Sequence, residues 1–173
     1  MTVSRKNAAA YALRWAEGRH PAYRSFDNDC TNFISQALLN GGMKMRGTSV
    51  DEGSKWAWWY KHGPVNALDS WSHPWSVAHD NYRFHQATER GRVVSKYWGV
   101  AIGDLLYADW EEDGRRDHVM IFTGNSPKDG LRVSGHTSDR KNVDASWWMA
   151  KAKADDSNNS VGFDYYHINY GEF

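Results

Sequence analysis

The sequence predicts an α+β fold in which helices come first and an antiparallel sheet follows. Apolar side chains recur with a helical period over about the first 40 residues, whereas short apolar runs separated by turn residues fill the second half. No repeat and no linker interrupts the chain. With 173 residues, 40% of them apolar, the chain is long enough for one domain, which we place at residues 1–173.

Two helices are predicted at the start of the chain. Ser4 can cap the first helix, which extends to about Glu17 with its apolar residues on one face. The second helix begins near Asp29 and stops at the Gly41–Gly42 pair. Cys30 lies in the first turn of this second helix, on the apolar face that must pack against the sheet.

The middle of the chain gives a weaker signal. Residues 43–75 show no clean period and are rich in Gly, Pro, Ser and Trp, so we expect a long irregular excursion with one short helix near residues 54–61. A third main helix is predicted over residues 76–90.

Four strands are expected after Gly103. The first three cover residues 105–110, 118–123 and 131–136, and turn residues separate each from the next. A polar connection over residues 151–160 then leads to a last strand within residues 161–170.

The composition excludes several classes of function. The 21 basic residues are balanced by 21 acidic ones, so the basic excess typical of a nucleic-acid-binding protein is absent. No stretch approaches the ~20 apolar residues of a membrane span. The one cysteine permits no disulfide within the chain. Residues 1–16 resemble an amphipathic helix and not a signal peptide, so we expect export or action at the cell wall by another route.

Tryptophan is unusually frequent, with ten in the chain. Most are expected in the core, because an indole ring buries a large apolar area. Trp56, Trp58 and Trp59 lie in the irregular excursion between Gly- and Ser-rich flanks. They are the best candidates for the wall of a substrate groove.

Cys30 and His118 are the strongest candidates for chemistry. A thiol at the first turn of a helix lies near the positive end of the helix dipole, which favours the thiolate. The free N–H groups of that turn can also stabilise an oxyanion. His118 begins an apolar strand expected to face the helix, which would give a nucleophile with its base. A lone cysteine on an apolar helix face can equally be a buried hydrophobe.

Several motifs resemble one bacterial family. The segment Asp29–Gln36, preceded by Phe26-Asp27-Asn28, resembles the nucleophile segment of the putative amidase domain family, a branch of the papain-like group that includes NlpC-type peptidases and CHAP amidases. The resemblance continues in motifs that span nearly the whole chain: Ala10-Tyr11-Ala12, Trp15-Ala16, Gly103-Asp104-Leu105, Asp117-His118-Val119 and His136–Arg140.

This resemblance implies a papain-like (NlpC-type) core and a cysteine hydrolase that cleaves amide bonds through an acyl-enzyme. Cys30 would be the nucleophile and His118 the general base. His136 would be the third member that orients the His118 ring, with Asp139 as the alternate. The oxyanion hole would use the backbone N–H of Cys30, with Tyr23 as a possible hydroxyl donor.

The implied substrate is bacterial peptidoglycan or a peptide, cleaved by a monomer without a cofactor. Three alternatives remain open: an acyltransferase with the same nucleophile, a secreted toxin or effector acting on a protein amide, and a non-catalytic glycan-binding module. We expect no metal site. The acidic residues between Asp109 and Asp117 do not fit an EF-hand loop, and His118, His136 and Asp139 lack the spacing of a zinc motif.

Overall fold

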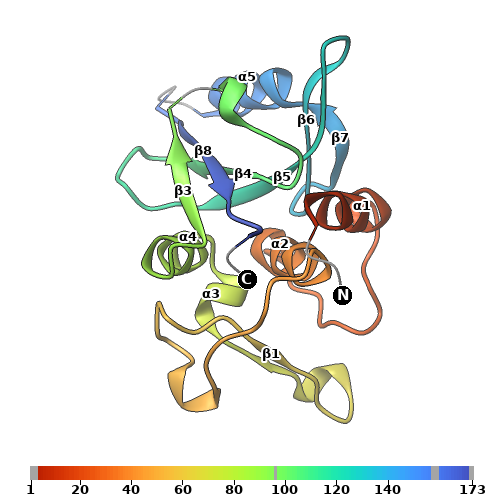
Figure 1. Cartoon of the computed structure of the whole chain (residues 1–173), viewed down its shortest axis with the longest axis vertical. Helices are drawn as coiled ribbons and strands as arrows, with labels where there is room; N and C mark the ends of the chain where they lie inside the picture. The colour runs from red at the N-terminus through yellow and green to blue at the C-terminus, as the bar shows by residue number, and fades with distance from the viewer. Residues whose placement is uncertain (1–3, 96, 157–159, 172–173) are drawn as a thin grey trace.

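The computed structural model describes residues 4–95, 97–156 and 160–171, and it places helices on both faces of a central sheet (Figure 1). The α-helices are α1 (Arg5–Trp15), α2 (Cys30–Asn40), α3 (His73–Ser76), α4 (Ala78–Ala87) and α5 (Ala145–Asp155). Three short 3-10 helices are η1 (Ser49–Asp51), η2 (Asn66–Leu68) and η3 (Tyr97–Gly99). The strands are β1 (Tyr60–Lys61), β2 (Ser70–Trp71), β3 (Gly91–Val94), β4 (Leu105–Asp109), β5 (His118–Ser126), β6 (Gly130–Gly135), β7 (Arg140–Asp144) and β8 (Gly162–Ile168). The predicted α+β class is confirmed.

The main sheet has six strands in the order β3-β8-β4-β5-β6-β7, and all its pairings are antiparallel. Strands β4 to β7 form a meander. Strand β8 returns across it to pair with β4, and β3 forms the far edge. Strands β1 and β2 form a separate two-stranded ribbon within the excursion. No helix among the described residues is long and apolar enough to cross a membrane.

Helices α1 and α2 form where the sequence predicts them. The Ser4 hydroxyl accepts a hydrogen bond from the backbone N–H of Asn7 at 3.4 Å and so caps α1. Helix α2 ends at Gly41, whose N–H bonds the carbonyl of Ala37 at 2.9 Å. All residues of α2 from Cys30 to Leu38 are buried, because α1, α3 and β5 all pack against it.

Strand β5 separates two apolar clusters. Val119 and Ile121 belong to the cluster that the sheet forms with α1, α2 and α4. Met120 and Phe122 point to the opposite face and pack in the cluster that includes Trp148 of α5. This alternation follows from the two-residue period of a strand, and it decides which face each residue of the candidate site occupies.

The structure corrects the sequence prediction in three places. Residues 54–61 do not form a helix: Tyr60 pairs with Trp71 across the small ribbon. Residues 151–155, expected in a polar connection, belong to α5, and residues 157–159 of that connection lie outside the described residues. Strands β3 and β7 were not expected. Both are edge strands whose partly exposed side chains give no apolar alternation.

Candidate active site

Cys30 is the first residue of α2 and is buried, with 2% of its surface exposed. Its Sγ donates a hydrogen bond to Oδ1 of Asn28 at 3.5 Å and lies 3.6 Å from the hydroxyl of Thr31. The backbone N–H of Val119 also faces the sulfur. The nucleophile candidate is therefore adjacent to the backbone at the start of β5, one residue from His118.

The predicted activation of the thiol by the helix start is not what the structure shows. Burial raises the pKa of the Cys30 thiol above its usual range, and this effect outweighs the hydrogen bonds from Thr31 and from the N–H of Val119, which lower it. The nearby carboxylate of Asp29 raises the pKa further. At neutral pH the resting cysteine is therefore a protonated thiol.

His118 is the first residue of β5, and its ring packs against two tryptophans that also contact each other, with centroids 6.3 Å apart. The ring centroid lies 5.8 Å from that of Trp110 and 5.6 Å from that of Trp148, with interplanar angles of 25° and 26°. Burial lowers the pKa of His118 to about 4. The imidazole is therefore neutral at pH 7 and can accept a proton.

The His118 ring and the Cys30 thiol are not hydrogen-bonded in the resting structure. Among the hydrogen bonds of the described residues, none joins Cys30 to His118. The reason is the strand alternation: His118 shares the α5 face with Met120, whereas Cys30 belongs to the cluster on the α2 face. The expectation that His118 simply faces the cysteine across the helix–sheet contact therefore does not match the resting geometry.

An open cavity of about 450 Å³ lies beside His118, and Cys30 is not part of its lining. Its lining includes Asn28, which accepts the hydrogen bond of the Cys30 thiol, and also His118 with Trp110. Thr137 and Arg140 contribute from the β6–β7 connection and the start of β7. The cavity thus brings the base candidate and the immediate neighbour of the nucleophile candidate into one space.

His136 lies beside the nucleophile segment and not beside His118. Its Nδ1 is 2.6 Å from Oδ2 of Asp29, its Nε2 is 2.9 Å from the carbonyl oxygen of Trp15, and its ring stacks on Phe33 with centroids 4.0 Å apart. Both ring nitrogens are thus engaged by oxygen atoms. The orienting role of His136 stays a prediction, and no contact in this structure supports it.

The alternate third member and the predicted hydroxyl donor also lie apart from His118. Asp139 makes two hydrogen bonds with the guanidinium of Arg19, at 2.9 and 3.0 Å. The ring of Tyr23 belongs to an aromatic cluster with Tyr60 and Trp75. Tyr23 does not line the cavity that His118 lines, so its place in an oxyanion hole stays a prediction without support from the geometry.

The predicted tryptophan wall is wrong for two of its three members. Trp58 is 0% exposed and Trp59 is 6% exposed, so both are core residues. The indole N–H of Trp58 donates to the hydroxyl of Ser35 at 3.0 Å, deep beneath α2. Trp56 is 47% exposed but does not line the cavity. The rings that flank His118 come instead from Trp110 and Trp148.

The connection between β6 and β7 carries backbone strain where it meets the nucleophile segment. Thr137 and Ser138 have φ angles of 61° and 62°, in the left-handed region that non-glycine residues seldom adopt. The Thr137 hydroxyl accepts a hydrogen bond from the N–H of Asp29 at 3.0 Å and donates one to Asn28 at 3.2 Å. These two bonds fix the strained turn against the residues directly before Cys30.

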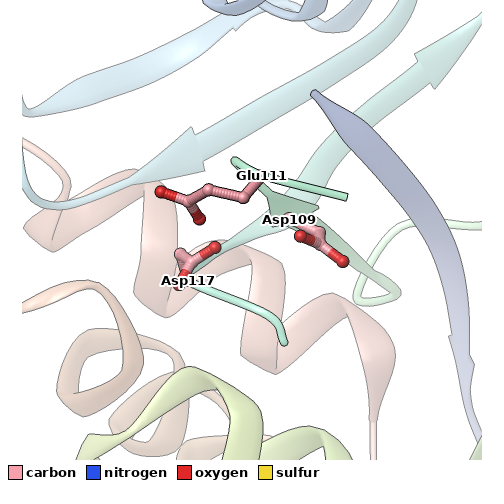
Figure 2. A group of neighbouring side chains, drawn as sticks. All are labelled: Asp109, Glu111 and Asp117. Carbon is pink, nitrogen blue, oxygen red and sulfur yellow. The ribbon is translucent and has the colours of Figure 1, made fainter. Parts of the chain in front are cut away.

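One acidic cluster lies in the β4–β5 turn (Figure 2). Carboxylate oxygens of Asp109, Glu111 and Asp117 lie within 4.8 Å of one another. Asp109 accepts hydrogen bonds from two N–H groups of the same turn, and Asp117 accepts one from the N–H of Trp110. Two of the three carboxylates therefore have a structural role in the turn.

The three residues considered as zinc ligands from the sequence, His118, His136 and Asp139, each have other partners in the structure. His136 is bound to Asp29 and Asp139 to Arg19, while the His118 ring packs against Trp110 and Trp148. Among the described residues, the acidic turn is the group of three that comes close enough to hold an ion.

Sequence reasoning missed Asn28, Trp110, Thr137 and Arg140 as residues of the cavity. Asn28 and Thr137 lie inside the motifs on which the family resemblance depends, and their place in these motifs could have identified them as site residues. Arg140 ends the His136–Arg140 motif and had the same signal, whereas Trp110 lies in no such motif. Their places depend on the β4–β5 and β6–β7 turns, which bring residues distant in sequence to the same end of the sheet.

Comparison with known proteins gives a consistent picture of the whole chain. Residues 2–159 match the family described as the putative amidase domain. The uncharacterized protein YhbB of Bacillus subtilis (strain 168) is 36% identical over 141 residues, which cover 79% of this chain and 42% of that protein. The uncharacterized protein YjcM of the same organism is 28% identical over 153 residues, covering 83% of this chain and 33% of that protein.

The chain thus spans less than half the length of either relative. No solved structure is significantly similar to it. The family match, in contrast, covers most of the chain and includes the Cys30, His118 and His136 segments. The chain therefore belongs to the putative amidase domain family.

Proposed function

We propose that this protein hydrolyses an amide bond by acyl transfer to Cys30, with His118 as general base. Membership of the putative amidase domain family supports amide hydrolysis in general. The cavity carries the finer proposal, because His118 and the Asn28 side chain that accepts the Cys30 thiol hydrogen bond line the same space. Cys30 itself does not line the cavity, and the Asn28 side chain marks the side of the cavity on which its thiol lies.

The resting state must rearrange before reaction. The thiol is protonated and the imidazole is neutral, so a proton has to move from Sγ to the ring. The His118 ring makes stacking contacts and no hydrogen bond among the described residues, so its rotation toward Cys30 would break no hydrogen bond of its own. Catalytic hydrogen bonds are often long in resting enzymes and tighten when substrate binds.

The chemical steps then follow in order. His118 takes the thiol proton as Sγ attacks the amide carbonyl, and N–H groups at the start of α2 stabilise the oxyanion. The C–N bond breaks, and His118 gives its proton to the leaving amine. Water, deprotonated by the same ring, attacks the thioester. The acid is released and the Cys30 thiol is restored.

The proposal includes a papain-like core and a cell-wall peptide as substrate. A cysteine at the start of a buried helix, packed against an antiparallel meander whose second strand begins with a histidine, supports the first part. The substrate class comes from the resemblance of the nucleophile segment to the wall-cleaving amidases and peptidases. The polar lining of the cavity is compatible with a peptide.

Digestion of purified peptidoglycan and isolated muropeptides, analysed by mass spectrometry, tests this function. We expect new products whose masses differ by the addition of one water across a single amide bond. Unchanged muropeptides, together with cleavage of an unrelated protein amide, would assign the site to a different substrate. Unchanged muropeptides and no cleavage of any amide would contradict the hydrolase.

A further inference from the structure

The cavity that contains His118 also contains one guanidinium whose charge has no carboxylate partner. Arg140 is the first residue of β7 and lines the cavity directly after the strained turn that contains Thr137 and Ser138. Its Nη1 donates to the backbone carbonyl of Asp139 at 3.2 Å. Among the described residues, no ion pair or other hydrogen bond of Arg140 is present.

The Nε of Arg140 is buried and has no hydrogen-bond partner among the described residues. A buried donor without a partner is costly and calls for an explanation. Because Nε is inaccessible to solvent in this structure, the Arg140 side chain has to turn toward the cavity for Nε to meet a ligand. With Nη1 bound to Asp139, the free donors are Nε and Nη2. These two N–H groups point in parallel from one edge of the guanidinium, and this edge matches the two oxygens of a carboxylate.

Asp117, Asp155 and Asp156 line the cavity with Arg140, and Asp139 precedes it in the chain; among the described residues none of these carboxylates forms an ion pair with Arg140. Asp139 is bound by the Arg19 guanidinium through both of its oxygens. Asp155, which lines the cavity from α5, forms an ion pair with Lys151 at 2.8 Å. The charge of Arg140 is therefore available to a ligand, although it lies among acidic groups of the protein.

We propose that Arg140 binds a carboxylate of the substrate through Nε and Nη2, so that the enzyme acts on peptides with a free carboxylate close to the amide that is cleaved. The strained Thr137–Ser138 turn supports this role, because strain is retained where a precise placement is needed and the turn fixes the start of β7. The choice of a peptide as ligand rests on the proposed function, but the binding itself does not require catalysis.

The test measures binding in the Cys30→Ser variant, in which turnover cannot interfere. Two probes are compared: N-acetyl-alanyl-alanine with a free carboxylate and the same dipeptide with a C-terminal amide. Titration followed by ¹H–¹⁵N NMR reports both the affinity and the place of binding, through the indole N–H of Trp110 in the cavity wall. Arg140→Gln and Arg140→Lys remove or change the donor pair.

Arg132→Gln is the matched control. Arg132 lies on β6, and like Arg140 its guanidinium donates to a backbone carbonyl, that of Asp129, but it does not line the cavity. We expect the free acid to bind about tenfold or more tightly than the amide, since hydrogen bonds to charged groups have this magnitude. Arg140→Gln should remove the difference, Arg140→Lys should restore part of it, and Arg132→Gln should leave it unchanged.

Three results would overturn the proposal: equal binding of acid and amide, an equal loss in Arg132→Gln and Arg140→Gln, or no binding of the free acid at millimolar concentration. A retained acid preference in a protein that hydrolyses no amide would separate the two hypotheses. In that case the carboxylate site would stand and the proposed catalytic function would fail.

Discussion

His136 and Asp29 form a buried pair directly before the nucleophile candidate, with Nδ1 and Oδ2 only 2.6 Å apart. The same Asp29 carboxylate accepts hydrogen bonds from the N–H of Phe26 at 3.0 Å and from the side-chain amide of Asn32 at 2.9 Å. One buried carboxylate thus joins β6, the loop before α2 and the first turn of α2. We infer that this pair positions Cys30 by fixing the start of its helix.

Replacing His136 should therefore reduce stability. His136→Ala removes the shortest contact of the buried Asp29 carboxylate, which keeps Arg19 Nε at 3.4 Å and the hydrogen bonds from Phe26 and Asn32, so we expect a loss of about 1–3 kcal/mol. Asp139→Ala is the control, because it breaks the partly exposed pair with Arg19, which is worth about 1 kcal/mol or less. Urea denaturation measures both. Equal free energies of unfolding for the two variants would show that the His136–Asp29 pair does not stabilise the start of α2.

The stability of the fold should depend on pH through two buried histidines. Burial lowers the pKa of His118 to about 4 and that of His85 to about 3, whereas an unfolded histidine titrates near 6.5. Above about pH 6.5 both rings are neutral in the folded and the unfolded chain. Below it the unfolded chain binds more protons, so the free energy of unfolding falls as the pH decreases toward these lowered values.

His85→Leu tests this dependence. The His85 ring is fully buried and neither nitrogen has a hydrogen-bond partner among the described residues. Its removal should make the acid slope shallower by about 1.4 kcal/mol per pH unit between roughly pH 4 and 6. Thermal or urea unfolding over this range gives the slope. A slope identical to that of the unchanged protein would mean that His85 protonates freely in the fold.

The tryptophans of the excursion should separate into core and surface residues. Trp58→Ala removes a fully buried ring and should cost about 3–5 kcal/mol of stability. Trp56→Ala removes a half-exposed ring beside Arg46 and Lys55, and should cost about 1 kcal/mol or less. Thermal melts distinguish them. If Trp58→Ala melted like the unchanged protein but had a higher KM, the groove wall would have to be reconsidered.

The elements with a complete local signal could be predicted from the sequence. Helices α1 and α2 have a helical apolar period with a cap or a glycine stop, and the meander has apolar runs between turn residues. Helix α5 was missed because it buries only Ala145 and Trp148, while most of its other apolar residues are small alanines. Its apolar stripe is too narrow to stand out, and its packing depends on the far face of the sheet.

The site was predictable in composition but not in geometry. Cys30 begins α2 and His118 begins β5, as the sequence predicted, but the two side chains lie on opposite faces of the sheet. The face of β5 that His118 occupies depends on the register of the strand, and no local pattern defines it. The partner of His136 is also a tertiary feature, because Asp29 is separated from it by 107 positions.

Alkylation of Cys30 should be slow in the resting protein at neutral pH. The thiol is buried and its pKa is raised, so the thiolate is scarce. With iodoacetamide we expect the rate at pH 7 to be lower in the folded than in the urea-unfolded chain by about tenfold or more, and to rise as the pH increases above about 9. Rapid labelling at pH 7 in the folded chain would indicate a thiolate and contradict the resting state described above.

The central claim is that Cys30 is the nucleophile, and turnover by the Cys30→Ala variant tests it most directly. Product formation from muropeptides is measured for both proteins at equal concentration, with circular dichroism and a thermal melt to show that the variant is folded. We predict complete loss of turnover in a folded Cys30→Ala protein. Substantial turnover by that folded variant would contradict the account, because no other cysteine in the chain could form the acyl-enzyme.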